Sequence, residues 1–291
     1  RDGADLFTKC EPAYLAALQY YQQLGFTYIN LGDSEELWEN LFLSVKRHNQ
    51  MTFEAERQFI DHDRFVKIFG NHDLYWDNDP LASVSLTQIY GKAIKIYEGL
   101  ILQTRVNGKP LEILMTHGHQ GDLQSDGNWF SKWFVSNIWG PLQGFLEINP
   151  NTPAYNNQLK TDHNRLMYEW STGQKDLLLI TGHTHQPVFR SMTHLEILYN
   201  NLDKARKAND LPQVAALERD IAALHLKGIS EPDFSGYFDS YFNTGCCCFN
   251  DGDITGIEIA DQCIRLIKWD HKKNCERVVL EECLLDELKI K

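Results

Sequence analysis

Four short runs of apolar residues in this chain each lead into a glycine that stands beside Asp, Asn or His. Apolar runs of about four to eight residues that glycine bounds are typical of buried strands. Layered α/β folds gather their ligands just past the carboxyl ends of such strands. The sequence therefore predicts an α/β fold with one polar site where four strands end: residues 26–31, 65–69, 111–115 and 177–180.

The residues around these runs fit one layered domain. Residues 12–24 carry apolar side chains at helical spacing, which predicts a helix before the first strand. Asn107 and Gly108 stand between two apolar runs, and this dipeptide favours a tight hairpin. We therefore expect strands and helices to alternate through a single domain that spans residues 1–291.

Two segments are expected to be additions to that domain. Residues 123–172 are rich in Trp, Asn and Pro and predict an aromatic-rich cap. Within them, residues 129–139 would form an aromatic stripe on a helix, which either lines the site or packs on the sheet. Residues 195–228 predict a helical hairpin, which could serve as an arm for binding a partner.

The charge balance limits the partners that the chain can have. There are 28 basic and 40 acidic residues, which gives a net charge of -12. A surface this acidic repels polyanions, so broad nucleic-acid binding is not expected. No apolar run approaches the roughly 18 residues that a membrane-spanning helix needs, which leaves peripheral membrane contact open. The oligomeric state stays open as well.

The cysteines indicate a reducing compartment. There are seven of them, and three are consecutive, namely Cys246, Cys247 and Cys248. An odd number without a Cys-x-x-Cys pair fits neither a disulfide framework nor a zinc knuckle, so we expect thiols in a cytoplasmic protein. For the consecutive three, we expect small buried side chains on a strand, with redox sensing as the alternative.

The polar residues past the four strands suit two divalent metal ions. Carboxylate, amide oxygen and imidazole are the ligands that Mn²⁺, Fe, Zn²⁺ and Mg²⁺ sites draw on. Two such ions about 3.5–4 Å apart polarise a phosphoryl group and lower the pKa of a bound water. The candidate ligands are Asp33, Asn71, His117, His183 and His185.

Two further residues are candidates for proton transfer. His72 follows the candidate ligand Asn71 and could protonate a leaving alkoxide as a general acid. Asp73 could orient His72 and raise its pKa. His119 either lines the pocket or has an ordinary surface role.

This ordered set resembles the calcineurin-like metallophosphoesterases. The family order is Asp-x-His, Gly-Asp, Gly-Asn-His-Asp/Glu, His and Gly-His-x-His, followed by a late Asn-x-Gly-Ser turn. Asn243, Thr244, Gly245 and Cys246 are similar to that turn, with Cys in the Ser position. The resemblance implies a hydrolase of phosphate esters. It also implies a sandwich of two mixed sheets flanked by helices, in the layer order α-β-β-α.

The resemblance also implies roles for single residues. Asp33 would bridge two metal ions. One ion would be completed by Asn71, His117 and His183, and the other would bind His185. His72 would be the proton donor. One departure stands out, because no Asp-x-His precedes Gly32 and Asp33 in this chain. We expect that motif just upstream of Arg1, since the second ion otherwise has only two protein ligands.

The substrate is expected to be small and phosphorylated. In detail, these motifs look more like those of bacterial phosphodiesterases and UDP-diacylglucosamine pyrophosphohydrolases. Nucleotide sugars and lipid-linked phosphates are therefore candidate substrates beside simple monoesters and diesters. Asp33 leads into Ser34 and Glu35, and Asp73 takes the place of Glu, which counts against the protein-phosphatase alternative. The other alternative is a degenerate phosphoesterase that acts as a binding scaffold.

Overall fold

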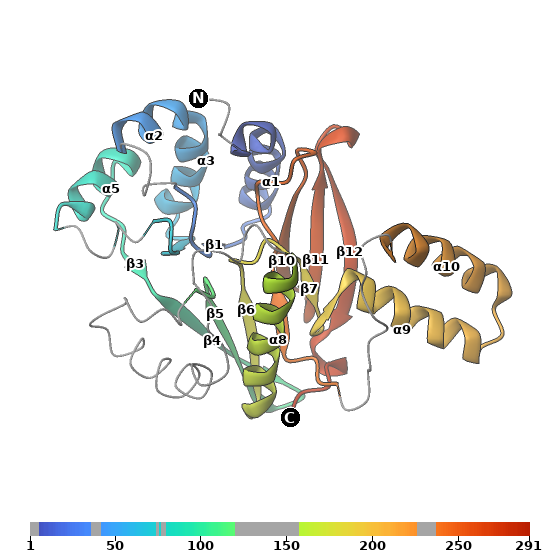
Figure 1. Cartoon of the computed structure of the whole chain (residues 1–291). Coiled ribbons are helices and arrows are strands. Elements are labelled where there is room, and N and C mark those ends of the chain that lie inside the picture. The colour runs from blue at the N-terminus through green and yellow to red at the C-terminus, as the bar shows by residue number, and fades with distance from the viewer. Residues whose placement is uncertain (1–5, 36–41, 74–75, 77–79, 120–156, 226–236) are drawn as a thin grey trace.

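The computed structural model of this chain describes residues 6–35, 42–73, 76, 80–119, 157–225 and 237–291. Within these ranges strands and helices alternate along the chain, so the predicted α/β class is confirmed (Figure 1). The strands of the described ranges form three sheets. Two of the three pack face to face as the expected sandwich.

The sheets differ in the direction of their strands. A small parallel sheet contains β1 (Tyr28–Asn30), β2 (Phe65–Ile68) and β3 (Ile96–Tyr97). A mixed sheet has the order β4 (Gly99–Val106), β5 (Lys109–Thr116), β6 (Leu177–Thr181), β9 (Tyr241–Asn243), β7 (Val188–Phe189), β8 (Met192–Thr193). An antiparallel sheet contains β10 (Ile254–Ala260), β11 (Cys263–Asp270) and β12 (Glu276–Leu284). The hairpin between β4 and β5 turns at Asn107 and Gly108, both with positive φ, as predicted.

The core of the sandwich lies between the mixed and antiparallel sheets. Successive side chains of a strand point to opposite faces of its sheet. One set from β5, β6 and β9 packs toward β11 and β12, and the other set packs against helix α8 (Asn157–Gly173). The first set is Ile113, Met115, Leu178, Ile180 and Phe242, and the second is Leu114, Leu179 and Tyr241.

Helices cover the outer faces of these sheets. Helix α1 (Glu11–Gln23), predicted from its apolar spacing, packs on β11 around Trp269. The layers therefore run α8, mixed sheet, antiparallel sheet, α1, which is the expected α-β-β-α order. Helices α2 (Phe42–His48), α3 (Gln50–Asp61) and α5 (Ala82–Tyr90) gather beside the small parallel sheet (Figure 1). Short 3-10 helices lie at Leu6–Lys9, His271–Lys273 and Leu285–Glu287.

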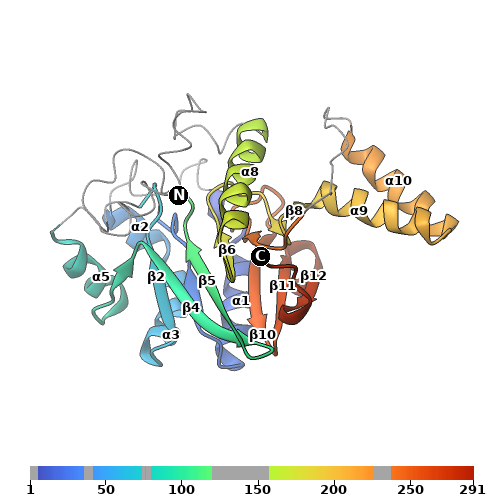
Figure 2. The same ribbon diagram turned by 90° about the horizontal axis from the view of Figure 1, so that it is seen from below.

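The hairpin expected at residues 195–228 is present as α9 (His194–Lys207) and α10 (Leu211–His225). The two helices pack on each other through their own small apolar cluster. Figures 1 and 2 show that they extend away from the sheets. In the part of the chain that the structure describes, no helix is long and apolar enough to cross a membrane.

The cap expected at residues 123–172 is corrected in its last part. Residues 157–172 belong to α8, where Met167 and Trp170 are buried against the mixed sheet. They therefore belong to the layers of the fold and not to a cap. The rest of the segment, including the aromatic residues 129–139, lies outside the described residues.

The residues after Asp33 also predict a helix that Ser34 caps, but the structure describes only part of that segment: residues 36–41 lie outside the described residues, and α2 begins at Phe42. Residues 31–35 are not helical. The buried Lys67 of β2 donates to the hydroxyl of Ser34 and, over 2.9 Å, to Oε1 of Glu35. A charge in the interior is costly unless it is paired, so Lys67 keeps both residues close to β2.

Candidate metal centre

Three of the candidate ligands, Asp33, His117 and His183, come together where the small parallel sheet meets the mixed sheet. β1 and β2 are parallel neighbours, and so are β5 and β6. Parallel neighbours end at the same edge of their sheet, so their following loops lie side by side. Asp33 follows β1, His117 follows β5, and His183 follows β6.

Asp33, His117 and His183 converge as the sequence predicts. Their potential ligand atoms all lie within 4.8 Å of one another. Nε2 of His117 lies 3.0 Å from Oδ2 of Asp33 and 3.2 Å from Nδ1 of His183. A carboxylate and two imidazoles at these separations form a set that divalent transition metals bind.

The ring of His117 is oriented by its other nitrogen. Nδ1 of His117 lies 2.7 Å from the backbone carbonyl oxygen of Leu31, which can only accept a hydrogen bond. Nδ1 therefore carries a hydrogen, and Nε2 is the atom that points at Asp33. Histidines that ligate metals are commonly oriented in this way by a carbonyl on the far side of the ring.

Charge and burial set the protonation of this group. Burial alone would lower the pKa of His117, but the charge of Asp33 and the hydrogen bond to it raise that pKa above its ordinary value. Burial alone would raise the pKa of Asp33, and the charge of His117 holds it well below its usual range. Burial, with the nearby charge of His117, keeps the pKa of His183 well below its usual value. Asp33 is thus ionised and His183 neutral, the forms that bind metals, whereas an ion has to displace the proton that Asp33 favours on Nε2 of His117.

Two glycines allow the loops after β1 and β2 to touch. A Cβ atom on Gly32 would lie 2.5 Å from the backbone nitrogen of Gly70, and one on Gly70 would lie 2.1 Å from Oδ1 of Asp33. Gly32 also has a φ of +95°, which favours glycine. This close approach lets the backbone N–H of His72 donate to Oδ1 of Asp33 over 2.8 Å.

The carboxylate of Asp73 contacts the loops after both β1 and β2. It accepts a hydrogen bond from the backbone N–H of Gly70 and, over 3.2 Å, from that of Ser34. Burial raises the pKa of Asp73 to about 6. These hydrogen bonds join the loop after β1 to the loop after β2. The expected effect of Asp73 on the orientation and pKa of His72 stays a prediction.

Asn71 and His119 have buried polar atoms that make no hydrogen bond to the described residues. Among the described residues, Oδ1 of Asn71 and both ring nitrogens of His119 lack a partner. The ring of His119 lies 5.2 Å from that of His117, and burial lowers its pKa to about 3. Buried polar atoms are rarely left unsatisfied in proteins. Their presence beside the candidate centre fits residues that bind an ion.

His163 was missed in the sequence. It lies on α8, its Nε2 is 2.9 Å from the carbonyl oxygen of Gly118, and its ring is 5.3 Å from that of His183. Burial lowers its pKa to about 4. A signal was present, because His163 shares the buried face of α8 with Met167 and Trp170 at helical spacing. An ionisable side chain on such a face requires a partner.

His185 does not join the first three ligands. It is grouped with Cys246 and Cys248, whose potential ligand atoms lie within 4.8 Å of its own. The three consecutive cysteines lie in the loop after β9 and not on a strand, which corrects the sequence prediction. His183 and His185 both have left-handed backbones, with φ of 62° and 57°. This conformation is uncommon outside glycine and is often found at functional sites.

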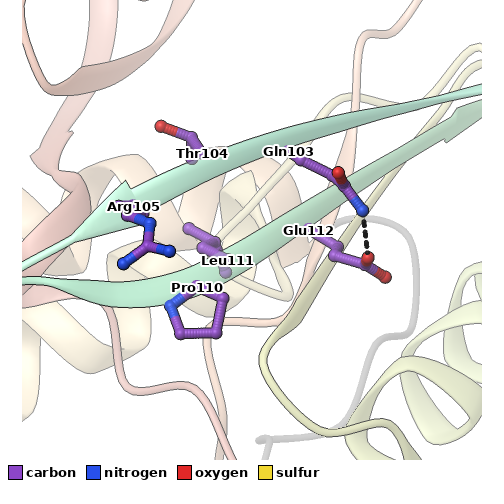
Figure 3. Close-up of a pocket in the computed structure, with 6 residues that line it drawn as sticks. All are labelled: Gln103, Thr104, Arg105, Pro110, Leu111 and Glu112. Atoms are coloured by element: carbon purple, nitrogen blue, oxygen red, sulfur yellow. Dashed lines mark hydrogen bonds between the residues drawn. The ribbon is translucent and has the colours of Figure 1, made fainter.

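A surface hollow lies elsewhere on the molecule. It has a volume of about 300 Å³ and is lined by residues of the β4–β5 hairpin, where Gln103 donates to Glu112 over 2.9 Å (Figure 3). Glu112 is near the start of β5, whereas His117 follows its end. At about 3.3 Å per residue this separates the hollow from the candidate centre by roughly 15 Å. The hollow is therefore not part of the metal centre.

Comparison with models of known protein families finds none that matches this chain, and comparison with curated proteins finds no match either. The side-chain geometry is therefore the basis for any function assigned to the chain.

Proposed function

We propose that this chain is a metal-dependent phosphoesterase that hydrolyses a small phosphorylated substrate at the Asp33–His117–His183 centre. The observation that carries the proposal is the convergence of these ligand atoms, within 4.8 Å, from the ends of β1, β5 and β6. A divalent ion bound there would polarise a phosphoryl group and supply a hydroxide near neutral pH. Mn²⁺, Fe, Zn²⁺ and Mg²⁺ are all compatible with carboxylate and imidazole ligands.

The residues of the centre have separate tasks in this proposal. Asp33 supplies a negative charge that is present at all ordinary pH values. His117 offers Nε2 to the ion, because its Nδ1 is held by Leu31. Asn71 adds a neutral oxygen whose hydrogen-bonding capacity is otherwise unused among the described residues. His119 and His163 lie at the edge of the centre as neutral imidazoles, which can accept a hydrogen bond from water or substrate.

His72 remains the candidate for the general acid. Its backbone N–H is bound to Asp33, which fixes the start of the side chain beside the centre. A proton from His72 to the leaving oxygen would avoid release of an unstable alkoxide. The hydrogen bonds from the backbone of Gly70 and Ser34 to the carboxylate of Asp73 hold this loop in place.

The proposal includes a second divalent ion at His185. The odd number of cysteines, without a Cys-x-x-Cys pair, also favours a cytoplasmic enzyme. Monoesters, diesters and pyrophosphates are equally compatible with the ligands. Nucleotide sugars and lipid-linked phosphates remain the candidates that the motifs suggest.

The test is a substrate panel combined with metal analysis. Purified protein is assayed on phosphate monoesters, diesters and nucleotide sugars with Mn²⁺, Mg²⁺, Zn²⁺ or chelator. We expect hydrolysis that requires metal and that is lost in His183→Ala. The exposed His62, whose Nδ1 contacts the carbonyl of Gln58, gives the matched control His62→Ala. Hydrolysis that persists in fully chelated protein would contradict the proposal.

One observation favours the scaffold alternative. The α9–α10 hairpin has its own apolar cluster and extends from the sheets as an arm (Figure 2). A scaffold needs no ion at Asp33, His117 and His183. Two bound ions per chain, as against one or none, therefore separate the two functions before any substrate is known.

A further inference from the structure

The loop after β9 brings two thiols to the imidazole of His185. Sγ of Cys248 lies 3.6 Å from Nδ1 of His185. The sulfur of Cys246 completes the group, and all three atoms lie within 4.8 Å of one another. All three residues are partly exposed, so an ion could reach them from solvent. The cysteines are thiols in this structure.

One buried side chain fixes both loops of this group. The amide of Asn243 donates to the carbonyl oxygen of Gly182 over 2.6 Å and to the hydroxyl of Thr184 over 3.2 Å. Its carbonyl oxygen accepts from the backbone N–H of Gly245 over 2.9 Å. Asn243 thus joins the segment before His185 to the segment before Cys246.

Contacts with Thr255 of β10 also hold the turn that precedes Cys246. Gly245 has a φ of +75°, and a Cβ atom there would lie 2.1 Å from the hydroxyl oxygen of Thr255. That hydroxyl donates to the carbonyl oxygen of Thr244 over 2.7 Å. The backbone N–H of Thr255 donates to the carbonyl oxygen of Cys246 over 3.1 Å. The cysteine loop is therefore fastened to β10, and the thiols are preorganised beside His185.

We propose that His185, Cys246 and Cys248 form a metal site that binds a thiophilic divalent cation of the Zn²⁺ class. Zn²⁺ binds thiolate sulfur at about 2.3 Å and imidazole nitrogen at about 2.1 Å, so tetrahedral geometry separates the two atoms by about 3.5 Å. The separation of Cys248 and His185 is 3.6 Å, which matches that value. Each thiol loses its proton to solvent as the ion binds. Three protein ligands leave the fourth position for water or substrate.

This site would supply the second ion with ligands that the chain contains. His185 is two residues from His183, so the two groups are neighbours and at most about 7 Å of chain separates their Cα atoms. Soft thiolates at one site and Asp33 at the other would give the two sites different metal preferences. The thiolate site goes beyond the proposed function and does not depend on it, because its ligands converge whether or not the chain hydrolyses esters.

Cys247 provides a matched control. It stands between the two candidate ligands in sequence, but its side chain packs against the cluster that contains Cys10 and Trp269. A serine at this position tests the effect of losing one thiol from the same loop without touching the proposed site.

The experiment uses Co²⁺ as a probe for Zn²⁺, with the full chain under reducing conditions. Cobalt bound to thiolate has a near-ultraviolet charge-transfer band whose intensity follows the number of Co–S bonds. We expect that band in the wild type, about half of its intensity in Cys246→Ser and in Cys248→Ser, and its loss in the double variant. Cys247→Ser should keep the full band. Circular dichroism verifies that each variant is folded.

Other variants separate this site from the Asp33 centre. Asp33→Asn should keep the thiolate band while it loses metal-dependent hydrolysis. If the wild type shows the band but hydrolyses nothing, the thiolate site stands and the proposed function fails. A reduced wild type that binds Co²⁺ without the band, or a band that survives in the double variant, would overturn the site. So would a disulfide between Cys246 and Cys248 that persists under reducing conditions.

Discussion

Oδ2 of Asp33 lies 3.0 Å from Nε2 of His117, although the two residues follow strands of different sheets. Asp33 follows β1 of the small parallel sheet, and His117 follows β5 of the mixed sheet. The hydrogen bond from His117 to Leu31 joins the same two sheets a second time. An ion at this junction would hold the two sheets together and would therefore stabilise the fold as well as act in catalysis.

Substitution of Asp33 tests both effects. Asp33→Asn keeps the size of the side chain and an oxygen for the N–H of His72, but it removes the charge that attracts the ion. We expect loss of the ion at the Asp33 centre, of hydrolysis and of the stabilisation that this ion provides, while an ion at the thiolate site stays bound. For the wild type, that stabilisation is about 2.7 kcal/mol at a metal concentration of 100 times Kd. Urea unfolding with and without metal measures it, and an equal gain in both proteins would contradict the prediction.

Gly70→Ala tests the contact between the two loops. The new Cβ would lie 2.1 Å from Oδ1 and 2.6 Å from the backbone nitrogen of Asp33, so Asp33 has to move. We expect a loss of about 1–3 kcal/mol in the free energy of unfolding, together with weaker metal binding. Gly256→Ala is the control, because nothing lies within 4 Å of a Cβ at that position. Unchanged metal affinity in Gly70→Ala would mean that the ion does not need this loop geometry.

His72→Asn tests the general acid. The backbone N–H that binds Asp33 is retained, so we expect metal content to stay as in the wild type. Esters with poor leaving groups should react more slowly by roughly 10²–10⁴-fold, since they need the proton most. Nitrophenyl esters should be affected much less. A series of leaving groups measures the difference, and equal losses along the series would exclude proton donation by His72.

Glu56 predicts a pH dependence of stability away from the metal centre. Burial raises the pKa of Glu56 above its ordinary value of 4.5, and the hydroxyls of Tyr14 and Tyr90 donate to its two oxygens. The folded state therefore holds this proton more tightly than the unfolded state. The contribution of Glu56 to stability is complete below the unfolded pKa and is lost as pH rises through the folded pKa.

Glu56→Gln removes that titration. Relative to the wild type, the variant should gain stability as pH rises above 4.5, by at most about 1.4 kcal/mol per pH unit. Urea unfolding across that range measures the gain. Glu54→Gln, on the exposed face of the same helix, should follow the wild type at every pH. A constant difference between wild type and Glu56→Gln would show that Glu56 keeps an ordinary pKa.

The strand ends could be predicted because their signals are local. An apolar run followed by glycine and a polar residue marked the loops of Asp33, His117 and His183, and Asn107 with Gly108 marked the hairpin. The contacts of Ser34 and Glu35 with Lys67 could not be predicted, because Lys67 is distant from them in sequence. Lys67 stands inside an apolar strand, and a buried lysine requires a carboxylate partner. The sequence therefore showed that Lys67 needs a carboxylate partner, but it did not show that this partner is Glu35.

The positions of Cys246 and Cys248 beside His185 could not be predicted from local sequence either. The strand prediction for Cys246 to Cys248 used their apolar character alone. Asn243 and Gly245 end the strand before them, because Asn243 turns its amide to the loop of Thr184 and Gly245 takes a positive φ. No local pattern in the sequence brings Cys248 to His185. That contact depends on the pairing of β6 with β9, which only the assembled sheet provides.

The left-handed backbones of His183 and His185 would set the stability of the fold against the proposed metal binding. A non-glycine residue in this conformation costs about 1–3 kcal/mol when the surrounding structure enforces it. Glycine at either position would release that strain and remove an imidazole. Laboratory evolution of this chain for heat resistance alone, without metal, should therefore enrich glycine at these two positions. A population evolved with metal present should keep both histidines.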